Sequence, residues 1–124
     1  MVINFNPKYI PGDIVYNHKK EITRITSSYL KGTKLFYYRD GECGWIREDA
    51  IKPIPLTPEI LNKNEWEYDG ATWIFKKGNI SIFILLDDKT YAAHLLGVRV
   101  LEFHFVHELQ HLLFGLGLKS EMEV

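Results

Sequence analysis

The residues whose types and spacing point most directly to chemistry lie near the C-terminus, where His107, Glu108 and His111 form the pattern H-E-x-x-H. On a helix, residues four positions apart lie on one face about a turn apart, so the two imidazoles can share one Zn²⁺. The glutamate between them can then polarise a metal-bound water. One hypothesis is therefore a zinc-dependent, metallopeptidase-like hydrolase, with His107 and His111 as metal ligands and Glu108 as the catalytic residue.

A catalytic zinc site needs a third protein ligand, and the sequence does not point to one. The segment after His111 contains no histidine. The longer pattern H-E-x-x-H-x-x-G-x-x-H also fails, because Phe114 and Gly117 stand at its last two defined positions. We expect the C-terminal carboxylates to lie on a frayed tail. The remaining candidate ligands are His18, His94, Glu121 and Glu123.

The H-E-x-x-H pattern falls in a helix that we predict from Glu102 to Leu116. At about 100° per residue, the histidines and Glu108 lie opposite the apolar face, so we favour a solvent-facing surface with no catalytic or metal-binding residue. Weak chelation of a transition metal by His107 with His104 or His111 is a further alternative. The apolar face, suited to packing on a sheet, comprises Phe105, Val106, Leu109, Leu112, Leu113 and Leu116.

Aromatic side chains near the Asp40-Gly41 dipeptide form a second candidate site. Tyr37, Tyr38 and Trp45 suit a stacking surface for a peptide or for single-stranded nucleic acid. The alternative is that these rings are core and cross-strand packing, which is the interpretation we favour. The lysines and arginines nearby are too scattered along the sequence to define a nucleic-acid patch.

The composition limits the classes of protein to consider. The chain has 124 residues, of which 46% are apolar, and a net charge of −1, which fits one folded domain or two small units. This charge gives no general attraction to nucleic acid or to anionic membranes. Cys43 is the only cysteine, so no intrachain disulfide forms. No signal peptide is visible, and the longest apolar run, Ile82 to Leu86, is too short to span a bilayer. We expect a cytoplasmic protein.

The first 55 residues read as short strands separated by turn signals. Asp40-Gly41 between two β-rich runs predicts a hairpin. Five short strands in so few residues suit a tightly curled SH3-like barrel. The predicted strands are Ile14–Asn17, Glu21–Thr26, Lys34–Tyr38, Cys43–Arg47 and Ala50–Ile54.

Three prolines between Pro53 and Pro58 mark the boundary, because proline denies hydrogen bonds to a strand ladder. Residues 56–124 should then form one compact unit. It begins with a short helix that has Thr57 as N-cap and Pro58 at its first position. An antiparallel meander of three or four strands follows, in which Ile80–Leu86 is central because only Ser81 in it is polar. The fold class expected is α+β, mostly β, closed by the C-terminal helix.

Two motifs carry a resemblance to a known family. Pro53-Ile54-Pro55-Leu56-Thr57-Pro58-Glu59-Ile60-Leu61 and Val106-His107-Glu108-Leu109-Gln110-His111-Leu112 resemble segments of a family of small uncharacterised proteins of gut bacteria, their phages and mobile elements. In that family the position of His111 is commonly Asn and the position of Glu108 need not be acidic. The resemblance therefore implies no activity, cofactor or partner, and it makes the H-E-x-x-H pattern a coincidence.

From these observations we expect a non-enzymatic accessory or adaptor protein of phage or mobile-element origin that acts through contacts with an unknown protein partner. The zinc-dependent hydrolase is the first alternative. A nucleic-acid-binding small barrel is the second.

Overall fold

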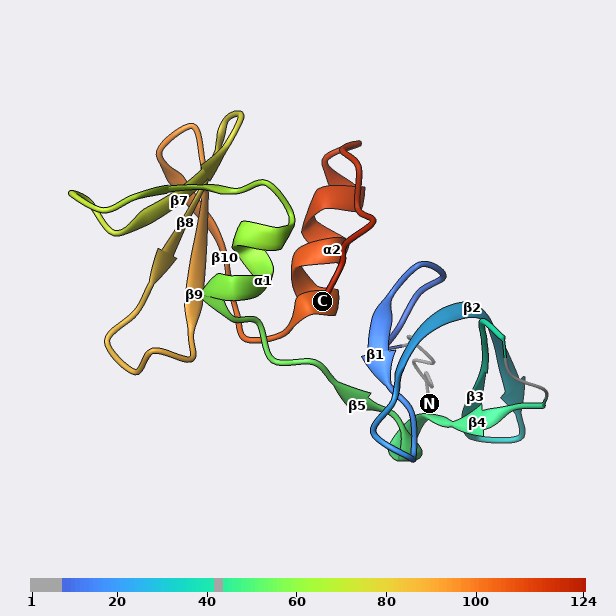
Figure 1. Cartoon of the computed structure of the whole chain (residues 1–124). Coiled ribbons are helices and arrows are strands. Elements are labelled where there is room, and N and C mark those ends of the chain that lie inside the picture. Colours follow the sequence, from blue (N-terminus) through green and yellow to red (C-terminus); the bar gives the residue numbers. More distant parts are fainter. Residues whose placement is uncertain (1–7, 42–43) are drawn as a thin grey trace. The chain divides into compact units, whose positions relative to one another are not determined.

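The computed structural model describes residues 8–41 and 44–124, so the predicted role of Cys43 as a strand residue lies outside the described residues. The chain divides into two compact units, the first ending at Ile54 and the second beginning at Pro55. Each unit contains one five-stranded antiparallel sheet, and the chain closes with a helix (Figure 1). The prediction of an α+β, mostly β fold is confirmed.

The sheet of the first unit has the order β4-β3-β2-β1-β5. Its longest strand, β2, pairs with β1 through its first residues and with β3 through the rest, and its ladder is irregular between Ile25 and Ser27. Such an irregularity bends and twists a strand, which lets one strand serve two neighbours. The elements are β1 (Ile14–Tyr16), β2 (Ile22–Lys31), β3 (Lys34–Arg39), β4 (Ile46–Arg47), the 3₁₀ turn η1 (Glu48–Ala50) and β5 (Lys52–Pro53).

The alternation of side chains along β3 separates a core face from an outer face. Leu35, Tyr37 and Arg39 point inward, and Tyr37 is fully buried. Lys34, Phe36 and Tyr38 therefore lie on the outer face. The buried core of this unit consists of Tyr9, Val15, Ile25, Tyr37, Ile46 and Ile51.

The sheet of the second unit is an up-and-down meander with the order β10-β9-β8-β7-β6. The central position predicted for Ile80–Leu86 is confirmed, because β8 lies in the middle. Both helices lie on one side of this sheet (Figure 1). The elements are α1 (Pro58–Lys63), β6 (Glu67–Asp69), β7 (Ile74–Lys77), β8 (Ile80–Ile84), β9 (Tyr91–Leu95), β10 (Val98–Phe103) and α2 (Val106–Gly115).

The first helix of this unit begins as predicted. The Thr57 hydroxyl accepts a hydrogen bond of 3.2 Å from the backbone N–H of Ile60, and Pro58 occupies the first helical turn. An N-cap of this kind satisfies one backbone donor that the helix itself leaves without a partner.

The start predicted for the last helix is wrong. Glu102 and Phe103 belong to β10, where they pair with Ala92 and Tyr91 of β9, and α2 begins only at Val106. Glu102 and Phe103 fit the apolar periodicity of a helix, but they form a strand. Their pairing with β9 outweighs the weak local preference for helix.

The tail that follows α2 is not frayed. The backbone N–H of Glu123 donates to Asn64 Oδ1 at 2.8 Å, and Asn64 Nδ2 donates to the carbonyl of Glu123 at 2.7 Å. Gln110 Nε2 also donates to the carbonyl of Ser120 at 3.1 Å, and Met122 is buried. These bonds hold the tail against α2 and against the end of α1.

No helix within the described residues is long and apolar enough to cross a bilayer.

Candidate functional site

The two histidines of the H-E-x-x-H pattern lie on one side of α2, but not as predicted. Their ring centroids are 5.4 Å apart in an edge-on arrangement. His107 is only 4% exposed, His111 is half-buried, and His104 precedes the helix instead of lying within it. The expectation that these side chains face solvent is therefore wrong for His107, which stacks on Phe105 with 6.0 Å between the ring centroids.

Glu108 is occupied as a capping residue. Its Oε1 accepts hydrogen bonds from the backbone N–H groups of His104 and Phe105, each at 3.2 Å. A carboxylate at the third helical position satisfies donors that precede the helix and also interacts favourably with the positive end of the helix dipole. In this position the carboxylate serves the start of α2 and is directed toward its backbone.

The candidate third ligands do not converge on the histidine pair. Over residues 8–41 and 44–124, no three His, Cys, Asp or Glu side chains gather where they could hold a metal ion. His94 lies in β9 with its ring 4.5 Å from that of Phe83, and His18 is exposed in the first unit. Glu123 is tied through its backbone to Asn64. Nothing in this geometry extends the pair into a catalytic zinc site.

A chain of polar contacts joins Asp87, Thr90 and His104 at the turn between β8 and β9. The Thr90 hydroxyl lies 2.6 Å from Asp87 Oδ2 and 3.1 Å from His104 Nε2. Asp87 also accepts bonds from the backbone N–H groups of Lys89 and Thr90. The bond from the Thr90 hydroxyl is the largest of the effects that lower the pKa of Asp87 to about 2. Because the hydroxyl donates its hydrogen to a weakly basic carboxylate, Thr90 is not activated as a nucleophile. The contacts stabilise the turn.

The aromatic residues of the first unit divide between the core and the surface. Tyr37 is fully buried, so its predicted place in a stacking surface is wrong and its predicted alternative place in the core is confirmed. Tyr38 and Trp45 do lie together, with their ring centroids 3.5 Å apart, and Tyr29 joins them at 4.9 Å from Trp45. Trp45 is 38% exposed and Tyr29 46% exposed.

Strand register explains how these rings come together. Tyr29 and Arg47 both lie directly opposite Phe36, and Tyr38 is two residues further along β3 on the same face. We call the set Tyr29, Phe36, Tyr38 and Trp45 the aromatic face. Tyr29 and Phe36 are not among the aromatic residues predicted for this surface, although the period-two alternation of β3 from Tyr38 back to Phe36 identifies Phe36.

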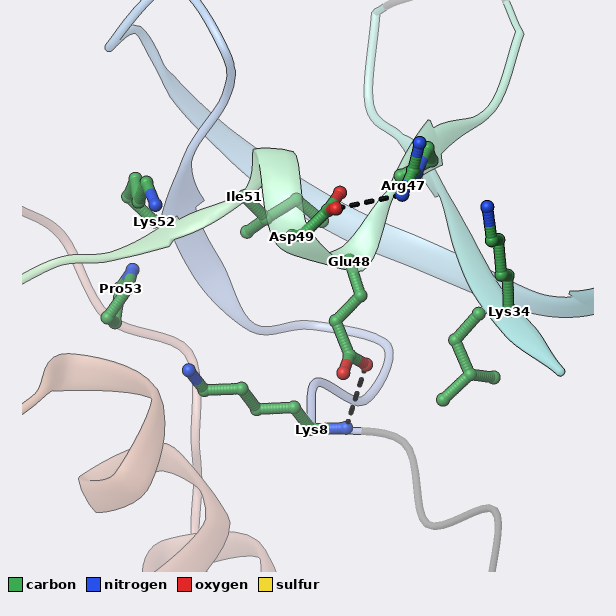
Figure 2. A pocket seen from close by; sticks show the side chains of 9 residues that line it. Lys8, Lys34, Arg47, Glu48, Asp49, Ile51, Lys52 and Pro53 are labelled. Atoms are coloured by element: carbon green, nitrogen blue, oxygen red, sulfur yellow. Dashed lines mark hydrogen bonds and ion pairs between the residues drawn. The ribbon is translucent and has the colours of Figure 1, made fainter.

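A pocket of about 440 Å³ borders the aromatic face (Figure 2). Lys34 and Arg47 connect the two, because they lie on the same outer face of the sheet as Phe36 and also line the pocket. All nine lining residues belong to the first unit. They are Lys8, Lys34, Leu35, Arg47, Glu48, Asp49, Ile51, Lys52 and Pro53.

The acidic groups of this pocket are already occupied. The Tyr37 hydroxyl donates a hydrogen bond to the Glu48 carboxylate, which also accepts one from the backbone N–H of Lys8 at 3.3 Å. Burial, and next this bond, raise the pKa of Tyr37 well above its usual value. Asp49 is bound to Arg47 at 2.9 Å.

The basic groups of the pocket are less fully paired. Within the described part of the chain, neither Lys34 nor Lys52 takes part in an ion pair, and Figure 2 places their side chains on opposite sides of Glu48. The sequence of the first unit, up to Ile54, contains nine Lys and Arg against six Asp and Glu, whereas the second unit contains six against ten. The positive charge of this protein is therefore concentrated in the unit that carries the pocket.

No protein-family model, curated protein or solved structure matches this chain.

Proposed function

We propose that this chain is a non-enzymatic accessory or adaptor protein that binds a peptide segment of a protein partner on its aromatic face. The observation that carries the proposal is the cluster of partly exposed rings of Tyr29, Tyr38 and Trp45 on the outer face of a sheet. Aromatic side chains supply much of the binding energy at protein interfaces, because each brings a large, rigid contact area.

The architecture of the first unit supports this proposal. Its strand order, with a 3₁₀ turn directly before β5, suits an SH3-like small barrel. Aromatic-lined grooves on barrels of this size bind extended, proline-rich peptides, whose backbone is already ordered before binding. The resemblance to proteins of phages and mobile elements supports binding of this partner in the bacterial cytoplasm.

Peptide binding fits the ring geometry better than nucleic-acid binding does. Bases stack on the open faces of aromatic rings. Here the Tyr38 and Trp45 rings lie against each other, with a tilt of 35° and centroids 3.5 Å apart, so each ring covers one face of the other. A cluster of partly exposed rings of this kind suits apolar side chains and proline rings.

The role of Glu108 supports a non-enzymatic protein. In a zinc-dependent hydrolase this carboxylate must reach the metal-bound water. Instead it caps α2 through the backbone of His104 and Phe105.

Selection of peptides from a displayed random library tests this function. Peptides enriched on the wild-type protein should bind Trp45→Ala at least about tenfold more weakly. Trp73→Ala is the matched control, since Trp73 is a 71% exposed tryptophan of the second unit and does not belong to the aromatic face. A folded Trp45→Ala protein that binds the selected peptides as well as the control does would contradict the proposal.

The same preparation should be titrated with single-stranded oligonucleotides over a range of salt concentrations. Tight, salt-sensitive binding that Trp45→Ala abolishes, with no peptide enriched, would replace the proposed function by nucleic-acid binding.

A further inference from the structure

We infer that the pocket beside the aromatic face is a subsite for an acidic side chain, so that the peptide ligand carries an aspartate or glutamate next to its apolar anchor. This inference rests on the proposed peptide-binding function. It adds the chemical class of the ligand and the position of the charge within it.

Basic residues outnumber acidic residues in the lining of the pocket. Four basic residues line it, and its two acidic residues are bound within the protein, Glu48 by the Tyr37 hydroxyl and the Lys8 backbone and Asp49 by Arg47. Lys34 and Lys52 form no ion pair within the described ranges. Two ammonium groups are thus available to a carboxylate from outside, and a positive pocket attracts such a group and excludes lysine or arginine at the same place.

Glu48 is held in a fixed position within the pocket. Its carboxylate accepts a hydrogen bond from the buried Tyr37 hydroxyl, and Figure 2 shows its side chain directed toward the backbone of Lys8. The carboxylate keeps its negative charge in these bonds but forms no ion pair with Lys34 or Lys52 within the described ranges. With four basic and two acidic residues in its lining, the pocket therefore keeps an excess of positive charge.

The pocket adjoins the aromatic face through its basic residues. Lys34 lies on the same face of β3 as Phe36 and Tyr38, and it is paired across the ladder with Lys31, which is also exposed. Arg47 lies opposite Phe36 on β4. Basic side chains therefore border the aromatic face on the side of the pocket, and a single bound segment can reach both.

The spacing follows from strand geometry. Tyr38 and Lys34 are four positions apart, which corresponds to about 13 Å along β3. An extended or polyproline peptide advances by about 3.1 to 3.4 Å per residue, so the acidic residue should lie about four positions from the residue that contacts Tyr38 and Trp45. We therefore expect selected peptides to share an apolar or proline anchor and an acid at this distance.

The test combines two protein variants with two versions of one peptide. The probe is the tightest peptide selected on the wild-type protein that contains an acid, together with its Glu→Gln or Asp→Asn version. The variant is the double substitution Lys34→Gln and Lys52→Gln. Lys19→Gln is the matched control, because Lys19 is exposed in the same unit but does not line the pocket.

We expect the double variant to bind the acidic peptide about fivefold more weakly at low salt. It should bind the neutral peptide as the wild type does. Lys19→Gln should change neither affinity by more than about twofold. Raising the salt concentration should reduce the difference between the two peptides.

Two results would overturn the inference. In the first, the double variant lowers the affinity for the acidic and the neutral peptide equally, which would show that the lysines do not contact the acidic side chain. In the second, no selected peptide carries an acid at the expected spacing. If binding still depends on Trp45 in either case, the proposed function stands and only the acidic subsite is lost.

Discussion

Replacing Tyr37 with Phe removes one hydroxyl from the centre of the first unit and leaves the ring in place. The ring keeps its edge-on contact with Tyr9, whose centroid lies 5.6 Å away. The hydroxyl donates to the Glu48 carboxylate and accepts from the backbone N–H of Tyr9 at 3.4 Å. A hydrogen bond to a charged group contributes about 1.5 to 3 kcal/mol net, so we expect Tyr37→Phe to lower the free energy of unfolding of this unit by about 2 kcal/mol.

Native-state hydrogen exchange measures this loss in each unit separately. Amides of β2 and β3 should exchange faster in Tyr37→Phe by a factor corresponding to about 2 kcal/mol, whereas amides of β8 and β9 serve as the internal reference. A double-mutant cycle with Glu48→Gln isolates the pair, and we expect a coupling energy of at least about 1 kcal/mol. A loss below about 0.5 kcal/mol, or additive effects in the cycle, would refute the reasoning.

Burial of Tyr37, and next the same hydrogen bond, determine how the stability of the first unit depends on pH. The pKa of Tyr37 is raised in the folded state, so the folded protein favours the neutral phenol. The stabilisation is fully present below the pKa of an unfolded tyrosine, near 10, and is lost as the pH rises above it. Tyr37→Phe removes this contribution, so the stability of the variant should fall less steeply at high pH than that of the wild type.

Three further predictions concern other parts of the chain. Burial raises the pKa of Tyr9 from 10.0 to about 12. Stability should therefore fall by up to about 3 kcal/mol between these pH values, and Tyr9→Phe, measured by urea unfolding across the range, should reduce the fall. Thr57→Ala removes the N-cap hydroxyl that accepts a hydrogen bond from the backbone N–H of Ile60. It should cost about 1 kcal/mol in the second unit, whereas Thr57→Ser should cost less. Protein purified without a tag or chelator should contain no stoichiometric zinc by elemental mass spectrometry; about one zinc per chain, lost in His111→Asn, would revive the hydrolase hypothesis.

Much of the fold follows from local chemistry that the sequence displays. The turn at Asp40-Gly41 needs a residue with positive φ, and Gly41 has a φ of 73°. The apolar run around Ile82 places β8 at the centre of its sheet. These features depend on residues that are adjacent in the sequence or on the spacing of apolar residues within one strand. They can therefore be predicted without knowing which distant parts of the chain pack against them.

The hairpin between β9 and β10 shows where local signals fail. Its two-residue loop is Leu96-Gly97, and both residues have positive φ, 51° and 83°. Asn or Asp is the residue expected before such a glycine, whereas leucine rarely adopts this conformation. The local sequence therefore does not predict this turn or β10, and helical periodicity extends the predicted helix back to Glu102, which lies in a strand.

The candidate sites divide in the same way. The sequence by itself determined which groups are present: two histidines and a glutamate at helical spacing, and aromatic residues around a hairpin. The tertiary structure alone decided their surroundings. Strand register brought Tyr29 to Trp45 from the far side of β3, and it buried Tyr37 while leaving Tyr38 half-buried on the outer face. Spacing along the chain fixes the relative directions of side chains within one element. Which face becomes covered, and which distant residues meet there, depends on contacts that form only when the elements pack.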